Sequence, residues 1–317
     1  MSQSDSAALP RLLAILGPTA TGKSALAIAL AQRYGGEVVA CDSTAVYRGF
    51  DIGTDKVAAD DQQGIPHHMV DVADPLEEYS AARYAREAER VIRDITARRR
   101  LPILVGGTGF YYRALTRGLF PGPGRDVRTR ERLARIAEKR GPERLHRWLT
   151  RVDPESGLRI QPRDLKRIVR ALEVYCLTRR PLTEHFAQTR APLADYAVTP
   201  LALTLPAERI AERVARRVDA QFGRGIVAEV RGLLARGLPE SAHPFSGLVY
   251  RQVLEYLHGV RGEAETRELI VRENRRYARR QLIWFRKEPN LQWIAGAGED
   301  PETLQRADEL FAATRPL

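Results

Sequence analysis

The segment that most constrains this chain is Gly17-Pro-Thr-Ala-Thr-Gly-Lys-Ser24, which matches the pattern of a phosphate-binding loop. An apolar run, Leu12–Leu16, precedes the loop, and an alanine- and leucine-rich run, Ala25–Ala31, follows it. Strand, glycine-rich loop and helix is the order that such a loop requires. The glycines let backbone N–H groups turn toward phosphate oxygens, and the start of the helix adds the positive end of its dipole. We therefore expect a diphosphate or a triphosphate to bind here.

Two side chains of the loop have the chemistry to complete such a site. Lys23 can reach terminal phosphates, and the Ser24 hydroxyl can hold Mg²⁺, which is the one cofactor that we expect. The predicted diphosphate-binding residues are Gly17, Pro18, Thr19, Ala20, Thr21, Gly22, Lys23 and Ser24.

The net charge of +11 and the isoelectric point near 10.0 are more than a small phosphate ligand requires. A polyanionic partner would account for them, because Lys and Arg beside a nucleic-acid backbone release counterions. An arginine-rich surface that reflects genome composition is the alternative. The two cysteines form no CxxC pair, and no apolar run is long enough to span a membrane. We expect a cytoplasmic protein without a membrane partner.

Further apolar runs predict the fold. Strands are expected at Glu37–Cys41, His68–Val72 and Leu101–Val105, with a helix over about residues 80–99. Alternating strands and helices predict a doubly wound parallel sheet, in which ligands lie beyond the carboxyl ends of the strands. The phosphate loop, Asp42 and the glycines at 106–109 all follow such ends, so we expect them to meet in one crevice.

The pattern changes after about Leu119, where Pro121–Gly124 interrupts it and helical periodicity then dominates to about Pro192. A strand-like run, Leu201–Leu205, returns the chain to the sheet, and 290–294 is the expected last strand. The predicted fold class is therefore α/β. Residues 1–118 and 197–317 would form a P-loop doubly wound parallel sheet core with C-terminal helices, and residues 119–196 would form an inserted all-helical domain.

Two helical stripes carry almost one sign of charge. Arg163, Lys166, Arg167 and Arg170 recur at i, i+3, i+4 and i+7, and a second stripe follows at Arg272, Arg275, Arg276, Arg279 and Arg280. Like charges at this spacing repel one another unless an anion is present. The stripes favour nucleic acid over a solvated helix face.

The residue-level reasoning leaves the chemistry open. A hydrolytic motor carries an apolar strand that ends in an acidic residue, but Leu101–Val105 ends in glycines. Asp42 could hold Mg²⁺ through water, as in a nucleotide kinase, or could act as a general base at the mouth of the phosphate site. A small-molecule kinase and a nucleic-acid-binding nucleotide switch are the competing functions.

The ordered series of motifs resembles the tRNA dimethylallyltransferases, also called tRNA isopentenyltransferases, over nearly the whole chain. The matching segments are the phosphate loop, Asp42-Ser43, Val46–Gly49, Asp51–Thr54 with Lys56, Pro66–His68, Leu104–Gly109, Arg167–Glu173, Tyr250–Gln252, and Arg280-Gln281 with Trp284. The resemblance implies transfer of the allyl group of dimethylallyl diphosphate to N6 of an adenosine beside the anticodon, at position 37 of tRNA. The diphosphate would leave, and a monomer would suffice.

The resemblance also implies the catalytic residues. Asp42 matches the base that takes the proton from N6, Thr19 matches the residue that bonds the bridging oxygen, and Arg217 matches an arginine that reaches the diphosphate. Lys23 and Mg²⁺ would stabilise the charge that grows on the leaving group.

The implied partner is the anticodon stem-loop of tRNA. The residues expected to contact it are Asp42, Ser43, Thr44, Ala45, Thr108, Arg130, Lys166, Arg167, Ile168, Val169, Arg170, Arg251, Arg279, Arg280, Gln281, Trp284 and Arg286. The chain departs from the family pattern at Gln161–Asp164, at Ser246 and Val249, and at Asp55, where alanine is common; none of these touches the proposed chemistry. His67 and His68 lack metal-ligand spacing, and Trp148 and Trp293 are expected to pack.

Overall fold

The structure is a computed structural model and describes residues 8–314. The chain divides into two compact units. The first comprises Met1–Leu115 together with Asp195–Leu317, and the second is Thr116–Ala194. The sequence predicts the insertion at residues 119–196. Each end of this predicted range lies within a few residues of the corresponding end of the second unit.

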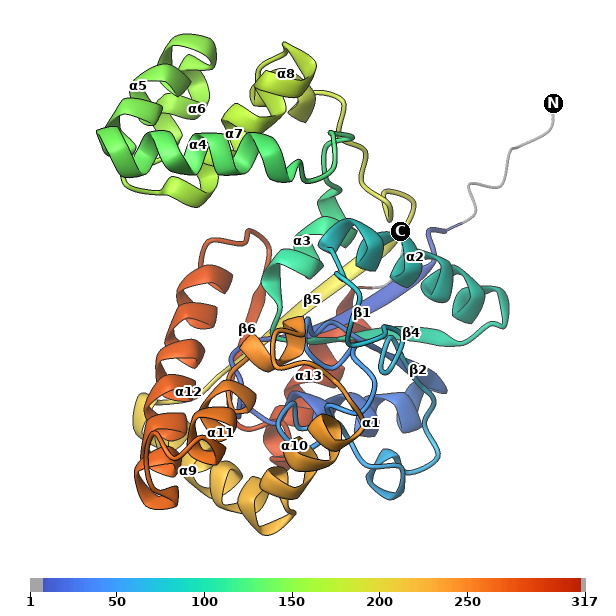
Figure 1. Cartoon of the computed structure of the whole chain (residues 1–317). Coiled ribbons are helices and arrows are strands. Elements are labelled where there is room, and N and C mark those ends of the chain that lie inside the picture. The colour runs from blue at the N-terminus through green and yellow to red at the C-terminus, as the bar shows by residue number, and fades with distance from the viewer. Residues whose placement is uncertain (1–7, 315–317) are drawn as a thin grey trace, which may run out of the picture. The chain divides into compact units, whose positions relative to one another are not determined.

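The first unit is built on a parallel sheet, which confirms the predicted α/β class (Figure 1). Within residues 8–314 the sheet has six strands in the order β3-β2-β4-β1-β5-β6. The strands are β1 (Arg11–Leu16), β2 (Gly36–Ala40), β3 (His67–His68), β4 (Leu101–Gly106), β5 (Ala197–Thr204) and β6 (Gln292–Ala295). Strand β1 lies between β4 and β5, with Leu13 opposite Ile103 and Thr199. The carboxyl ends of β1, β2 and β4 therefore lie next to one another.

Helices cover both faces of this sheet. The helices of the first unit are α1 (Lys23–Tyr34), α2 (Ala81–Ala97), α3 (Gly109–Arg117), α9 (Ala207–Gly223), α10 (Ile226–Ala235), α11 (Tyr250–Leu257), α12 (Glu263–Phe285) and α13 (Pro301–Ala313). Figure 1 shows α1 on one side of the sheet and α2 and α3 on the other. Leu26 and Leu30 of α1 and Phe311 of α13 join the sheet residues in one buried core. These apolar contacts hold the phosphate loop, which lies between β1 and α1, at the edge of the core.

The second unit is helical. It contains α4 (Val127–Arg140), α5 (Pro142–Val152), α6 (Pro154–Arg159), α7 (Leu165–Thr178) and α8 (Leu182–Phe186). Its core includes Leu133, Leu149, Ile168 and Leu172, which are 0–1% exposed. The buried Glu173 carboxylate accepts hydrogen bonds from Arg130 (2.7 Å) and Arg170 (2.7 Å), which compensate its charge inside the unit.

One predicted strand is wrong over most of its length. The sequence predicts His68–Val72, but the strand β3 ends at His68. Met69 and Asp71 have φ of 62° and 56°, a left-handed conformation that no β-strand accommodates. The Asp71 carboxylate instead accepts a 2.5 Å hydrogen bond from the Lys56 ammonium, so the chain turns toward that residue.

The described residues contain no helix that is both long enough and apolar enough to cross a membrane. Cys41 and Cys176 are both free thiols, and burial raises the pKa of Cys41 to about 12. Cys41 therefore behaves as a small buried residue.

Candidate active site

The phosphate loop turns sharply between β1 and α1. Gly22, at the start of α1, has a φ of 84°, and a side chain there would meet the Gly298 backbone nitrogen at 2.6 Å. No side chain caps the start of α1. Because the first N–H groups of a helix lack intrahelical partners, they are available to an anion. A sharp turn between a strand and a helix thus lies where the sequence predicts one, and phosphate binding by it stays a prediction.

Lys23 follows this turn and lines a cavity of about 160 Å³. Its ammonium donates a 2.6 Å hydrogen bond to the Pro18 carbonyl. Although Lys23 keeps part of its surface open to the cavity, the surrounding protein atoms remove most of the hydration of the amine. Burial and then the charge of Arg217 lower its pKa to about 7, against a smaller opposing effect of Asp42. Among the protein groups alone, Lys23 is therefore only partly charged near neutral pH.

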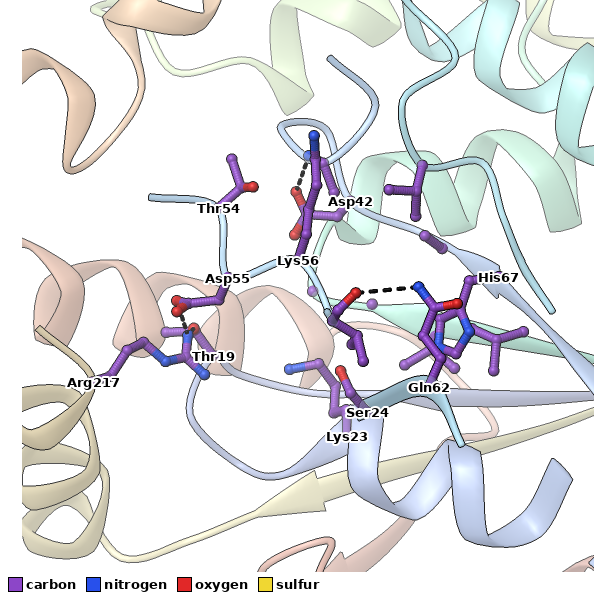
Figure 2. Close-up of a pocket in the computed structure, with 18 of the residues that line it drawn as sticks. Thr19, Lys23, Ser24, Asp42, Thr54, Asp55, Lys56, Gln62, His67 and Arg217 are labelled. Carbon is purple, nitrogen blue, oxygen red and sulfur yellow. Dashed lines mark hydrogen bonds and ion pairs between the residues drawn. The ribbon is translucent and has the colours of Figure 1, made fainter. Parts of the chain in front are cut away.

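Arg217, on α9, fixes the orientation of the Thr19 hydroxyl. One guanidinium nitrogen donates to Thr19 Oγ1 at 2.7 Å and lies 3.2 Å from Asp55 Oδ2. Because Oγ1 accepts from Arg217, its own proton is left to be donated elsewhere. Figure 2 shows Arg217 beside Thr19 and Asp55, with Lys23 and Ser24 below in the same view. Thr19, Lys23, Ser24 and Arg217 can donate hydrogen bonds to an anionic ligand in the cavity.

Asp55 is one side chain at this site whose part the sequence did not reveal: it was expected to lie apart from the proposed chemistry, but it pairs with Arg217. Its carboxylate also pairs with Arg224 at 3.0 Å and accepts from Gln221 at 3.0 Å. Burial raises the pKa of Asp55 above its usual value, and the two arginines oppose this. The only signal in the sequence was its departure from the alanine common in the family.

Asp42 lies just after β2 and lines the same cavity. Its Oδ1 accepts hydrogen bonds from the Thr44 amide (2.8 Å), the Thr44 hydroxyl (2.6 Å) and the Ala45 amide (3.3 Å). These bonds fix the carboxylate. The second oxygen is engaged in none of them, so a carboxylate oxygen remains to accept a proton.

Gln281, on α12, ties the phosphate loop to the neighbouring strand end. Its Oε1 accepts from the Thr19 amide at 2.8 Å, and its Nε2 donates to the Gly107 carbonyl at 2.9 Å. A side chain at Gly107 would collide with this amide, which is a structural reason for the glycine there. The neighbouring Tyr277 also lines the cavity; burial and then the Asp42 charge raise its pKa to about 12. Tyr277 was not predicted from the sequence. It lies one helical turn before Gln281 on α12, and both residues line the cavity.

The cavity has walls of two kinds. One part is polar and carries Thr19, Lys23, Ser24 and Arg217; another consists of small apolar side chains, namely Val38, Ala40, Val57, Val70 and Val105. Such a cavity suits a ligand with a charged end and a short hydrocarbon end.

The residues present also fit a magnesium ion. The described residues contain no cluster of three or more His, Cys, Asp or Glu side chains that could hold a metal. Mg²⁺ beside a phosphate usually has only one or two protein ligands and takes the rest from phosphate oxygens and water. Ser24 lies on the cavity wall in the first turn of α1, where the loop pattern places this ligand.

Comparisons with known proteins give one family. The model of the IPP transferase family matches residues 45–288. The chain belongs to the IPP transferase family. A protein of Solibacter usitatus named tRNA dimethylallyltransferase is 46% identical over 95% of this chain and 98% of its own length.

Solved structures agree with this family. The full-length tRNA isopentenylpyrophosphate transferase of Bacillus halodurans has a TM-score of 0.68 and 34% identity, and the match covers 95% of this chain and 99% of that one. A eukaryotic dimethylallyltransferase acting on tRNA has a TM-score of 0.78 and 27% identity, with 97% and 81% covered. The resemblance seen in the motifs is thus confirmed.

In this IPP transferase, several of the predicted RNA-contacting residues lie around the cavity. The Thr108 hydroxyl accepts from the Ser43 amide at 3.0 Å, so Thr108 lies next to the Asp42–Ala45 turn. Arg280 and Trp284 line a small adjoining pocket with Tyr277, and Arg279 and Arg286 line a separate groove. Arg251 is exposed on α11 but lines neither.

Two of these predicted RNA contacts, Gln281 and Trp284, make contacts within the protein. Both groups of the Gln281 amide are bonded within the protein, and Trp284 packs on Gly109 with the Arg113 guanidinium 4.6 Å from its ring centre. As RNA contacts they stay predictions.

The remaining predicted contacts lie in the helical unit. Lys166 and Arg167 are exposed on α7, while Val169, Arg170 and Arg130 are partly buried. Ile168 is an incorrect prediction as a contacting side chain, because it has 0% exposure and packs in the core of the unit. Its side chain instead holds α7 against the core of the unit.

Proposed function

We propose that this chain is a tRNA dimethylallyltransferase, which transfers the dimethylallyl group of dimethylallyl diphosphate to N6 of the adenosine at position 37, next to the anticodon. The observation that carries the proposal is the cavity. It combines a diphosphate cradle, a wall of small apolar residues and a fixed carboxylate within one space. A five-carbon allylic diphosphate has this combination of a charged and an apolar part.

The transfer exchanges one bond to carbon for another. The bond between C1 of the donor and the bridging oxygen breaks, and the oxygen leaves with the electron pair. N6 of the adenosine bonds to C1 and loses a proton, which the Asp42 carboxylate accepts. The N6 lone pair is delocalised into the ring, so removal of the proton as attack proceeds makes the amine a better nucleophile.

The loop residues act on the leaving group. The Thr19 hydroxyl, oriented by Arg217, donates to the bridging oxygen on which charge develops. Lys23, Arg217 and the free N–H groups of the first turn of α1 bind the diphosphate oxygens. Preorganised donors that meet developing charge stabilise the transition state more than the ground state.

Mg²⁺ is proposed as the cofactor, held by Ser24. When bound, it would neutralise part of the diphosphate charge. The site as proposed has no strand-end carboxylate after β4, because β4 ends at Gly106 and Gly107 follows. This fits a loop that binds a leaving group rather than one that transfers phosphoryl.

The proposed partner is the anticodon stem-loop of tRNA. The target base must leave its stack to reach Asp42, at a cost of about a few kcal/mol that is smaller in a loop than in a duplex. The exposed Arg275 and Arg279 of α12, together with Arg286 directly after it, line a groove suited to phosphates. We further propose that the enzyme acts in the cytoplasm as a monomer, because all of the catalytic residues come from one chain.

The test is to incubate the protein with unmodified tRNA, dimethylallyl diphosphate and Mg²⁺ and to analyse the digested tRNA by mass spectrometry. We expect an adenosine heavier by one dimethylallyl group in place of a hydrogen. ATP with the same tRNA is the control. Transfer of the γ-phosphate of ATP, with the allylic donor ignored, would refute the proposal in favour of a kinase.

A further inference from the structure

The helical unit carries a groove that the predicted tRNA-contacting residues do not include. It lies between α4 and α5, has a volume of about 680 Å³, and is lined by Arg132, Arg135, Ile136, Lys139, Arg140, Arg144, Leu145, Arg147, Trp148 and Arg151. Seven of these residues are cationic and none is acidic. The groove therefore has one sign of charge along its whole length.

The spacing of these residues explains how the groove forms. The lining residues of α4 recur at three- and four-residue intervals from Arg132 to Arg140, and those of α5 do the same from Arg144 to Arg151. Residues at this spacing share one face of a helix. Leu133 and Leu149, on the neighbouring faces of these helices, are buried in the core of the unit. Packing of the two helices thus brings their cationic faces together.

The cations of the groove have no carboxylate partners among the described residues. All seven are exposed, and no ion pair within residues 8–314 involves any of them. Two other arginines of the unit do have carboxylate partners: Arg159 pairs with Glu155 at 3.3 Å and Arg180 with Glu184 at 3.2 Å. Like charges held together without an anion raise the energy of the free protein, so this cluster favours binding of a polyanion.

The cationic stripe that the sequence indicated on α7 differs from the groove because its arginines have carboxylate partners. Its arginines are compensated: Arg163 pairs with Glu143 (3.5 Å), Arg167 with Asp164 (3.3 Å) and Arg170 with the buried Glu173 (2.7 Å). Only spacing along one helix was visible in the sequence, and the partners come from other elements. The groove between α4 and α5, by contrast, gathers seven cations for which the described residues provide no ion pair.

The chemistry of the groove favours RNA over a membrane. A membrane-bound helix needs an exposed apolar face beside its cations. Here Leu145 is buried, Ile136 and Trp148 are partly buried against the core, and the exposed side chains are cationic. Guanidinium groups bind phosphodiesters in a bidentate manner, and a concave groove can enclose a strand of backbone. The partly exposed Trp148 ring adds a face for a sugar or a base.

We propose that the groove between α4 and α5 binds the sugar–phosphate backbone of the tRNA substrate and adds affinity without reading sequence. The proposal rests on the tRNA transferase activity proposed above. Contacts to phosphate position the RNA but do not specify bases, so this groove would lower the Michaelis constant for tRNA and leave the chemical step alone.

The test compares two triple variants with the same change in net charge. Arg135→Gln, Lys139→Gln and Arg147→Gln together remove three groove cations. Arg159→Gln, Arg180→Gln and Arg306→Gln remove three exposed arginines, each of which has a carboxylate partner in the structure. Binding of unmodified tRNA is measured by fluorescence anisotropy from 50 to 300 mM KCl, and prenyl transfer is measured under the same conditions.

We expect the groove variant to bind tRNA about ten- to a hundredfold more weakly at 100 mM KCl, with a slope of log affinity against log salt reduced by about two to three. Its kcat and its inhibition by inorganic diphosphate should equal those of the wild type, and the control variant should lose less than about threefold. Circular dichroism checks the fold. If the triple variant does not fold, Arg147→Gln alone should lower the slope by about one.

An unchanged salt slope in the groove variant, or an equal loss in the control variant, would overturn the proposal. So would loss of binding to phosphatidylserine vesicles with tRNA binding retained, because the groove would then be a membrane contact. Failure of the wild-type protein to prenylate tRNA would count against the proposed function instead, and the groove is judged by binding alone.

Discussion

The lowered pKa of Lys23 predicts that diphosphate binding takes up a proton. In the protein without ligand this pKa is about 7, compared with 10.5 for an ordinary lysine, because burial and Arg217 disfavour the charged amine. A bound diphosphate stabilises the ammonium and raises the pKa again. The ligand therefore prefers the protonated site, and its affinity must fall as the pH rises above about 7.

The size of the effect follows from the pKa of the free site. At pH 7 about half of the Lys23 amines are already charged, so binding takes up about half a proton, and at pH 8.5 it takes up nearly one. Only about 3% of free sites are charged at pH 8.5, so the affinity should be about thirtyfold below its low-pH limit, or ~2 kcal/mol.

Isothermal titration calorimetry measures this uptake directly. Inorganic diphosphate is titrated at saturating Mg²⁺ in two buffers of different ionisation enthalpy, at pH 7.0, 7.75 and 8.5. Lys23→Arg is the matched variant, because it keeps the charge and does not titrate, while the ionisation of the ligand is common to both proteins. Equal proton uptake by the wild type and Lys23→Arg across this range would refute the reasoning, since Lys23 would then be charged before the ligand arrives.

Four other substitutions test the rest of the site and the helical unit. Asp42→Asn keeps an oxygen for the local hydrogen bonds but no base, so kcat should fall by about 10²–10⁴ with tRNA affinity unchanged, as measured in single-turnover assays. Asp55→Ala frees Arg217 for the diphosphate, so the inhibition constant of inorganic diphosphate should drop by about five- to tenfold, given a screened charge contact of ~1 kcal/mol; weaker inhibition would contradict this. Gln281→Leu leaves a loop amide and a carbonyl unpaired, so urea denaturation should show a loss of ~2–4 kcal/mol and the Michaelis constant of the donor should rise. Glu173→Gln removes the buried negative charge that pairs with Arg130 and Arg170, so unfolding should show a loss of ~3–5 kcal/mol. Burial alone would raise the Glu173 pKa, but its arginine partners outweigh this and lower it, so the wild type should lose the same stabilisation in acid as the pH falls below 4.5.

The sequence was most informative where one short segment determines its own structure. The order of strand, loop and helix from Leu12 to Ala31 is a local pattern, and the structure has β1, the turn and α1 in that order. The strand ending at Gly106 was equally clear, because a fully apolar run that ends in glycines is typical of a buried parallel strand. The strand predicted over His68–Val72 was less clear from the sequence. Left-handed residues at 69 and 71 interrupt it, and the ion pair between Lys56 and Asp71 that holds this turn joins residues 15 positions apart.

The parts of the site that the sequence could not reveal depend on distant partners. Gln281 and Thr19 are 262 positions apart, and no pattern in either segment indicates that one amide joins the phosphate loop to Gly107. The charge balance of the arginines was hidden for the same reason. A stripe on α7 looks cationic in the sequence, yet Glu143 and Glu173 neutralise two of its arginines.

Asp55 and Lys23 together explain how the free protein limits the positive charge of this site. In the free protein Arg217 has Asp55 as a counterion, and Lys23 is only half charged near pH 7, so the cavity holds little uncompensated positive charge. An incoming diphosphate changes both: it charges Lys23 and offers Arg217 a second anion. Binding of the diphosphate thus increases the positive charge of the cavity. Once the carbon–oxygen bond has broken, the leaving group carries one more negative charge and is held more tightly, which would slow its release. The Asp55 carboxylate competes with the diphosphate for Arg217 and so weakens the binding of the leaving group. This gives a physical reason for an acidic residue at position 55 of a diphosphate site.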